Sequence, residues 1–516
     1  MKMNMRSIGF MACIWAAVCT GFLFVACSDS DDSTLEQGEG DPDITIDGNA
    51  VYSEGLLFNN GTEIGNGYQN YYFTGKETIK KGTYLLKGWV YVTEGAELTI
   101  EPGTIIKGDK QTQAALIIEP GGKAIMQGTA SEPIVMTSAQ AAGQRKPGDW
   151  GGLIICGKAK HNEGSAPIEG GPSTIHGGDD DDDNSGIFQY IRVEFAGYPF
   201  QADQEINGIT FGSVGRGTTV SHLQVSYSND DSFEWFGGSV NCKYLVAYNG
   251  WDDEFDTDNG FSGHVQFCLS IRDPKIADQS QSNGFESDNR SDGAQVSPYT
   301  NSVFSNVTFI GPGTNKNRAA GYVNDADYIN GGEMYPNNGS GLGKFQAAMQ
   351  IRRSSQLCCY NSVAIGYPIG LIIDGERGNS VGFAQDGTIK LQNIIFANME
   401  VLGSDANKQY EDILGVYDNG TITYDETQES FSSTFFKSQP GNAYYEDEDD
   451  LLLTDTYDTG QNYIPQTGSP LLGTASFTGV SSSFLDTSVT YIGAFSGPED
   501  TWMAGWTNFD PQYTEY

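Results

Sequence analysis

The sequence predicts an all-β protein folded as a right-handed parallel β-helix, a solenoid whose coils stack along one axis. The first observation is a motif that returns after 22 residues: Asn-Asp-Asp-Ser-Phe-Glu at 229–234 becomes Trp-Asp-Asp-Glu-Phe-Asp at 251–256. A looser copy, Ser-Asn-Gly-Phe-Glu-Ser-Asp, follows at 282–288. Turn-rich motifs that recur at intervals of 20 to 25 residues are typical of stacked coils.

The second observation is that β-type runs lie between the copies. Residues 223–227, 244–248 and 265–271 are rich in Val, Leu, Ile, Phe and Tyr, and glycine and asparagine separate them. The chain has 66 glycines and no long run with a period of 3.6 residues. This pattern favours short strands joined by turns over helices.

Stacked coils place equivalent residues directly above one another, and this makes the repeat specific. The alignment predicts an internal ladder of Phe233, Phe255 and Phe285. Beside it, on the opposite side of the strands, it predicts a ladder of carboxylates from Glu234, Asp256 and Glu286. Such carboxylates repel one another unless water solvates them or a cation bridges them.

A second repeat marks the beginning of the solenoid. Leu-Thr-Ile-Glu-Pro-Gly at 98–103 returns as Leu-Ile-Ile-Glu-Pro-Gly at 116–121, where proline fixes the first corner of a turn and glycine supplies a positive φ at the second. We read this step as one coil, so that Leu116 and Ile118 stack on Leu98 and Ile100. The expected coil length is therefore 18 to 23 residues.

The charge balance excludes some classes of partner. The chain has 28 Lys and Arg against 67 Asp and Glu, which gives a net charge of −39. Nucleic acids and anionic membrane surfaces bind basic patches, so neither is an expected partner.

The first residues predict an address. Lys2 and Arg6 precede an apolar stretch at 8–25, and the segment ends Phe-Val-Ala-Cys at Cys27, followed by Ser-Asp-Ser-Asp-Asp. This resembles a bacterial lipoprotein signal, which implies cleavage after 1–26 and a lipid on Cys27. The acidic residues that follow resemble the surface-export tag of Bacteroidetes lipoproteins, which implies an outer-membrane lipoprotein facing the cell exterior. The alternative is an ordinary secretory signal with a chance cysteine.

The rest of the chain divides by composition. Residues 27–48 are rich in Ser, Asp, Gly and Glu and are expected to form a flexible acidic tether. An N-terminal cap is expected at 49–80, the parallel β-helix at 81–403, and a C-terminal extension and cap at 404–516. The aromatic residues of the last stretch, Trp502, Trp506 and Phe509, are expected to cover the open end of the solenoid.

Several motifs together resemble a known family. They are Glu-Pro-Gly-Thr-Ile-Ile-Lys-Gly at 101–108, Gly-Asp-Trp-Gly-Gly-Leu-Ile-Ile-Cys-Gly at 148–157, the Asp-Asp-Ser-Phe-Glu-Trp-Phe-Gly-Gly stretch at 230–238, and Gly-Trp-Thr-Asn-Phe-Asp at 505–510. They resemble a poorly characterised family of Bacteroidetes surface lipoproteins with a right-handed parallel β-helix. The resemblance implies an architecture and a location, and little chemistry.

Calcium is the first candidate ligand, because hard cations bind six to eight oxygen atoms and stacked acidic residues supply them. The candidate ligands are Asp230, Asp231, Glu234, Asp252, Asp253, Asp256, Asp258, Glu286 and Asp288. The alternative is a solvated acidic edge, or a ladder of carboxylates that accept bonds from backbone amides at the corners of the coils.

Catalysis is the second possibility. Parallel β-helices include pectin-degrading hydrolases and polysaccharide lyases, and hydrolases use two carboxylates as acid and base. Asp230, Asp252 and Asp253 are the candidates here, but the Gly-His-Gly and Arg-Ile-Lys motifs of those hydrolases are broken around His264 and Arg272. Lyases would need calcium and an arginine or lysine base.

Binding without turnover is the third possibility. Exposed tyrosine and tryptophan rings stack on sugars, and six of them lie near expected loops: Trp235, Trp251, Tyr299, Tyr322, Tyr328 and Tyr335. The alternative is that most of these rings belong to the core. The sequence therefore favours a non-catalytic surface lipoprotein that binds a glycan or another ligand, or docks on an outer-membrane transporter. The rival is a polysaccharide hydrolase or lyase.

Overall fold

The computed structural model describes residues 44–516, except 68–69, 202–203, 337–339 and 419. Cys27 and the expected signal and tether segments therefore lie outside the described residues, apart from the last few residues of the tether. In the described part, no helix is both long and apolar enough to cross a bilayer.

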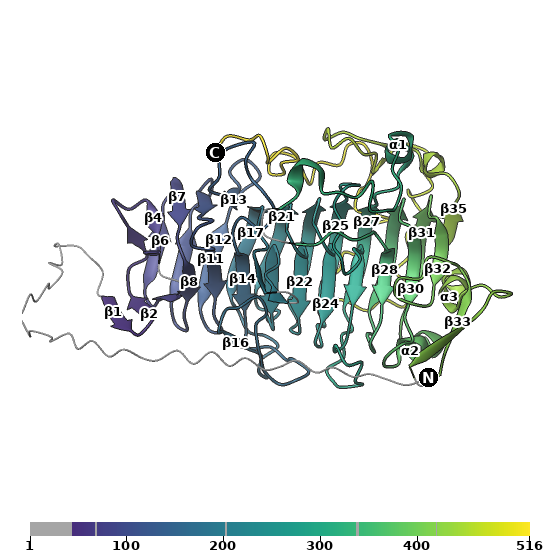
Figure 1. Ribbon diagram of the computed structural model, residues 1–516, viewed down its shortest axis with the longest axis horizontal. Helices are drawn as coiled ribbons and strands as arrows, with labels where there is room; N and C mark the ends of the chain where they lie inside the picture. The colour runs from purple at the N-terminus through teal and green to yellow at the C-terminus, as the bar shows by residue number, and fades with distance from the viewer. Residues whose placement is uncertain (1–43, 68–69, 202–203, 337–339, 419) are drawn as a thin grey trace, which may run out of the picture. The chain divides into compact units, whose positions relative to one another are not determined.

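The described chain is a parallel β-helix, and this confirms the predicted fold class (Figure 1). Two long sheets run along the solenoid axis, and apart from the hairpins that begin each sheet their strands pair in parallel. The first sheet has 13 strands: β1 (Ile44–Asp47), β2 (Ala50–Ser53), β5 (Asn70–Phe73), β8 (Trp89–Val92), β11 (Ala115–Ile118), β14 (Gly152–Cys156), β20 (Ile209–Gly212), β22 (Phe233–Phe236), β24 (Phe255–Asp258), β26 (Phe285–Ser287), β28 (Ala347–Ile351), β30 (Ile369–Ile373) and β32 (Val401–Ser404).

The second sheet has 16 strands and forms the two remaining sides of each coil. Its strands are β3 (Leu57–Phe58), β4 (Glu63–Ile64), β6 (Lys76–Ile79), β7 (Thr83–Leu86), β9 (Glu97–Ile100), β10 (Ile105–Gly108), β12 (Lys123–Gln127), β13 (Ile134–Ser138), β17 (Gly186–Glu194), β21 (Thr219–Ser226), β23 (Cys242–Tyr248), β25 (His264–Ile271), β27 (Val303–Ile310), β29 (Cys358–Ile365), β31 (Leu391–Ala397) and β35 (Ala443–Tyr445).

The long strands of the second sheet bend at one equivalent position. β12 pairs with the first half of β17 and β13 with its second half, so β17 spans two sides of the coil. The residue at the bend has a positive φ in every long strand from β17 to β31. These residues are Tyr190, His222, Tyr244, Phe267, Asn306, Asn361 and Asn393. A left-handed residue inside a strand turns the backbone sharply, and this shapes the coil.

The remaining elements decorate the coils. Four hairpins join β15 (Ala166–Pro167) to β16 (Ile175–His176), β18 (Pro199–Gln201) to β19 (Gln204–Glu205), β33 (Leu414–Asp418) to β34 (Thr421–Asp425), and β36 (Leu453–Thr454) to β37 (Ile464–Pro465). The helices are α1 (Asn315–Ala319), α2 (Ser380–Gln385), α3 (Phe431–Ser438) and the 3-10 turns η1 (Gly332–Met334) and η2 (Glu448–Leu451).

The Glu-Pro-Gly repeat was misread as one coil. Leu98 lies opposite Ala124, and Leu116 lies opposite Val90, so the prediction that Leu116 stacks on Leu98 is wrong. The two turns close different corners of the solenoid, because the same turn chemistry serves any corner. The coil length is also more variable than expected, from 22 residues between Asp231 and Asp253 to 64 between Asn283 and Ala347.

Both ends of the solenoid differ from the sequence interpretation. Parallel pairing already begins where β2 pairs with β5, inside the segment expected to be a cap. At the other end α3 packs against β30 and β32, while Trp506 packs on Tyr190 and His222 at the side of the second sheet. The yellow tail in Figure 1 runs above the strands toward β13. The apolar outer side of the second sheet needs a cover, and the tail provides it.

Candidate functional site

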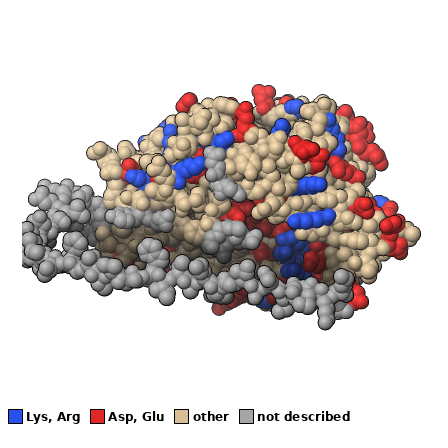
Figure 2. All heavy atoms as spheres, in the orientation of Figure 1, with Lys and Arg blue, Asp and Glu red and all other residues tan. Residues whose placement is uncertain are grey.

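A groove of about 870 Å³ lies on the outer side of the first sheet, over β22, β24 and β26. Acidic residues dominate its lining: Glu163, Glu169, Glu205, Asp230, Asp231, Glu234, Asp252, Asp253, Asp256, Asp258, Asp278, Glu286 and Asp288. Arg352 and Arg353 lie at one end, and His161 and His176 also contribute. Figure 2 shows acidic atoms gathered in the middle of this face, with basic atoms beside them.

The two ladders predicted from the repeat are confirmed. Phe233, Phe255 and Phe285 are paired in register and have no exposed surface. Glu234, Asp256 and Glu286 are paired in register one position later in each strand. Successive side chains of a strand point to opposite sides, so the phenylalanines fill the core and the carboxylates form the floor of the groove.

Some carboxylates bind the backbone of the next coil. Asp231 Oδ1 accepts a hydrogen bond of 2.8 Å from the Asp253 N–H, and Asp253 Oδ1 accepts one from the Asn283 N–H. The Asn283 side-chain amide also bonds Asp253 Oδ2 at 3.5 Å. The alternative reading, carboxylates that bind backbone amides at the corners, therefore holds for Asp231 and Asp253. Asp253 is fully engaged in this role.

Arginines of the chain neutralise one end of the floor. Arg352 Nε donates to Asp288 Oδ1 at 2.9 Å, and its Nη2 donates to Glu286. Arg353 Nη1 donates to Asp288 Oδ2 at 2.6 Å. Glu286 and Asp288, two of the nine candidate calcium ligands, thus already have a cationic partner.

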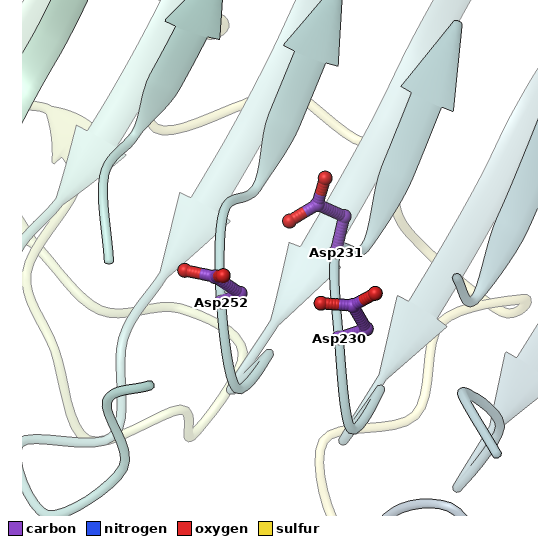
Figure 3. Close-up of side chains that lie close together, drawn as sticks. All are labelled: Asp230, Asp231 and Asp252. Atoms are coloured by element: carbon purple, nitrogen blue, oxygen red, sulfur yellow. The ribbon is translucent and has the colours of Figure 1, made fainter. Parts of the chain in front are cut away.

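The middle of the floor holds two groups of carboxylates that are close enough to share a cation. Asp230, Asp231 and Asp252 each place one oxygen within 4.8 Å of the others, and so do Asp231, Glu234 and Asp256. Figure 3 shows Asp230 and Asp231 on one turn and Asp252 on the neighbouring turn. Asp231 belongs to both groups, and no ion pair joins any of these five residues to a lysine, arginine or histidine of the described chain.

Burial and mutual repulsion raise the pKa values of these groups. Burial is the main cause for Asp231, followed by the charges of Asp230 and Asp256, and the pKa rises well above its usual range. The pKa of Asp258 rises to about 8, through burial and the neighbouring Asp288. Two buried oxygens, Asp252 Oδ1 and Asp256 Oδ1, have no hydrogen-bond partner in the described chain. Carboxylate oxygens without protons or partners are the ligands that hard cations prefer. The residues present therefore fit a divalent cation.

Other residues of the groove could not be assigned from the sequence. Asp278 and Ser280 belong to the excursion at 272–281, and Glu163 and Glu205 belong to segments before the repeat. The only signal was that long insertions in a solenoid gather on one side.

The six aromatic candidates lie elsewhere. Trp235 and Trp251 have no exposed surface, and Tyr322 is 4 % exposed, so these rings belong to the core or to the packing of loops. Tyr299 packs on Phe383, and Tyr328 packs on Tyr322. Tyr335 alone is exposed, at 41 %, and its hydroxyl bonds the Ser340 carbonyl beside the groove. None of the six is among the residues that line the groove.

The broken hydrolase motifs do not reach the groove either. His264 bonds Ser482 through Nδ1 at 2.7 Å, away from the lining residues. Arg272 is 1 % exposed and pairs with Glu254 at 3.0 Å, with both side chains fully buried. Arg272 is thus unsuited to act as the base of a lyase, because its guanidinium has no access to the groove.

The stacked coils and the carboxylate-lined groove define a parallel β-helix protein with a groove suited to cations. The chain belongs to the family of pectate-lyase-like β-helix domains, whose model matches residues 72–441. No curated protein and no solved structure matches the chain. The family match specifies the β-helix domain and carries no information on lineage or lipid anchoring.

Proposed function

We propose that this protein is a non-catalytic, surface-exposed outer-membrane lipoprotein whose β-helix binds Ca²⁺ in the acidic groove and presents that groove to a ligand or a transporter. One contrast within the groove carries the calcium part. The chain supplies arginines to Glu286 and Asp288, whereas Asp230, Asp231, Asp252, Glu234 and Asp256 have no such ion pair. Stacked carboxylates of equal burial need the same compensation, and an external cation supplies it.

Calcium is expected to stabilise the fold. A cation bound only by the folded state adds about 2.7 kcal/mol at a concentration one hundred times its Kd. We expect a rise in Tm when Ca²⁺ is added to chelator-treated protein, measured by differential scanning fluorimetry. Asp231→Asn should remove most of this rise, because Asp231 belongs to both groups, while the amide oxygen can still accept from the Asp253 N–H.

Asp288→Asn is the matched control for that experiment. Asp288 already binds Arg352 and Arg353, so this variant should lose some stability but keep the response to Ca²⁺. A Tm that does not change with Ca²⁺ in the parent protein would exclude the calcium site. A full response in Asp231→Asn would place the cation elsewhere.

The location of the protein rests on the sequence around Cys27. Cys27→Ala should move the protein from the membrane fraction to the soluble fraction, because the lipid attachment site is lost. Immunoblots of both fractions measure this. Ser28→Ala is the control and should leave the protein in the membrane fraction. Equal membrane retention of Cys27→Ala would show that the anchor lies elsewhere.

A polysaccharide hydrolase is the second candidate. Asp230 and Asp252 have oxygens within 4.8 Å of each other in the groove, and burial raises both pKa values. Retaining glycosidases hold two carboxyl groups about 5 to 5.5 Å apart, one of them protonated. We expect no new reducing ends and no unsaturated products when the protein is incubated with a panel of glycans, with or without Ca²⁺. Products that disappear in Asp252→Asn would establish the enzyme instead.

A further inference from the structure

The tail segment, defined as residues 466–516, crosses the outer side of the second sheet without joining it. Within this segment, all of which the structure describes, the only β pairing is a bridge between Leu472 and Tyr491. Backbone N–H and C=O groups that lose water on packing need other partners. In this protein, side chains of the solenoid provide them.

Two buried glutamines bind the tail in the same way. Gln266 donates to the Asp486 carbonyl at 3.0 Å and accepts from the Asp486 N–H at 2.7 Å. Gln224 donates to the Asn508 carbonyl at 2.7 Å and accepts from the Asn508 N–H at 2.9 Å. Neither glutamine has any exposed surface. Each side-chain amide thus pairs with both polar groups of one tail residue, as a neighbouring strand would.

The asparagines at the bends continue this pattern. Asn361 Oδ1 accepts from the Ser476 N–H at 2.8 Å, and Asn393 Nδ2 donates to the Ser476 carbonyl at 3.2 Å. Asn306 Nδ2 donates to the Tyr491 carbonyl at 2.8 Å. All three contacts go to the backbone of the tail, so they do not depend on its side chains.

Arginines bind the far end of the tail segment. Arg192 Nη1 donates to the Trp506 carbonyl at 3.1 Å. Arg145, which is 1 % exposed, donates to the carbonyls of Pro511 and Thr514 at 2.5 and 2.8 Å. The solenoid therefore contacts the tail backbone with polar side chains from the β29–β31 end to Arg145.

Apolar pockets lie beside these polar contacts. Trp506 and Met503 have no exposed surface, and the Trp506 ring packs against Tyr190 and His222 with centroids 5.9 and 5.7 Å apart. Trp502 packs on Tyr244 at 5.4 Å. Main-chain bonds combined with side-chain pockets are how extended peptides bind to sheet edges.

We infer that this side of the solenoid is a binding site for an extended polypeptide, and that the tail segment is its intramolecular ligand. The polypeptide is recognised through its backbone by Gln224, Gln266, Asn306, Asn361 and Asn393, and through its aromatic side chains by the ring stack at the bends. The inference does not depend on the calcium groove, which lies on the first sheet.

The test separates the tail from the solenoid without removing it. Thr478 and Gly479 are both exposed, and a specific protease sequence can be inserted between them in the full chain. After cleavage we expect the fragment to co-elute with the solenoid in gel filtration at micromolar concentration. A fluorescent synthetic peptide of residues 480–516, added in excess, should exchange with it and label the solenoid.

Changes in the peptide distinguish backbone recognition from other packing. Methylation of the Asp486 backbone nitrogen removes the hydrogen bond to Gln266 and should weaken binding about tenfold. Asp486→Asn in the same peptide changes only the side chain and should change binding less than about twofold. In the solenoid, Gln266→Leu should weaken the unmodified peptide and abolish the effect of the methyl group.

Three results would overturn the inference, with circular dichroism and melting of the cleaved protein as the folding control. One is that the fragment separates from a folded solenoid. Another is that the cleaved fragment stays bound but never exchanges with the labelled peptide, or that the solenoid unfolds when the fragment leaves, since the tail would then be part of the core. The third is that the methylated peptide binds as tightly as the unmodified one.

Discussion

Arg272→Met is expected to destabilise the protein by about 3 to 5 kcal/mol, the cost of removing one partner of a buried ion pair. The Arg272 guanidinium bonds Glu254 Oε1 at 3.0 Å, the Gly250 carbonyl at 3.1 Å and the Asn283 carbonyl. Burial already raises the pKa of Glu254, and Arg272 is the main group that lowers it. Without Arg272, the Glu254 carboxylate would have to bind a proton or remain charged inside the protein.

Denaturant unfolding of the parent and variant measures this cost. The double variant Arg272→Met with Glu254→Leu should recover much of the lost stability, because it removes the stranded carboxylate as well. Lys160→Met is the matched control, since Lys160 pairs with Asp181 at the surface, and such pairs contribute about 0 to 1 kcal/mol. A loss below about 1 kcal/mol in Arg272→Met would contradict the assignment of a structural ion pair.

In calcium-free buffer, the stability of the protein is expected to fall as the pH rises from about 4 to about 8. The groove carboxyls have pKa values above those of an unfolded chain, and that of Asp258 is about 8. Between these two values the folded state binds more protons than the unfolded state. Stability is therefore fully present below the unfolded pKa and is lost as the pH rises through the folded pKa.

The expected slope is about 1.4 kcal/mol per pH unit for each carboxyl that keeps its proton in the folded state. Melting curves at several pH values measure it, and saturating Ca²⁺ should flatten the dependence by replacing the protons. Asp258→Asn should reduce the slope, whereas Asp292→Asn, at an exposed carboxyl paired with Arg290, should not. Stability that rises with pH over this range in calcium-free buffer would show that the groove carboxyls are ionised without a cation.

Strand periodicity allowed the sequence to predict the centre of the site. Alternation along residues 233–236 places Phe233 inside and Glu234 outside, and the 22-residue step to Phe255 places Asp256 beside Glu234. Both signals are local, because the pleat fixes the side of each residue and parallel pairing fixes the register between neighbouring coils. The β-helix, the phenylalanine ladder and the carboxylate ladder followed from them.

The tertiary structure decided which carboxylates have partners. Arg352 lies 66 residues after Glu286 in the sequence, beyond a long insertion, and only the pairing of β26 with β28 brings the two together. The sequence gave no means to distinguish Glu286 from Asp256, because an ion pair depends on the distance between coils and the length of an insertion leaves no periodic pattern.

The same reason explains the two misplaced features. Glu-Pro-Gly turns fit several corners, so only strand pairing shows that Leu98 faces Ala124. The tail has no strand periodicity, and its position depends on side-chain amides such as Gln224 and Gln266 that belong to coils far away in the sequence. The sequence determined what repeats along the solenoid axis, and the fold alone determined what meets across its surface.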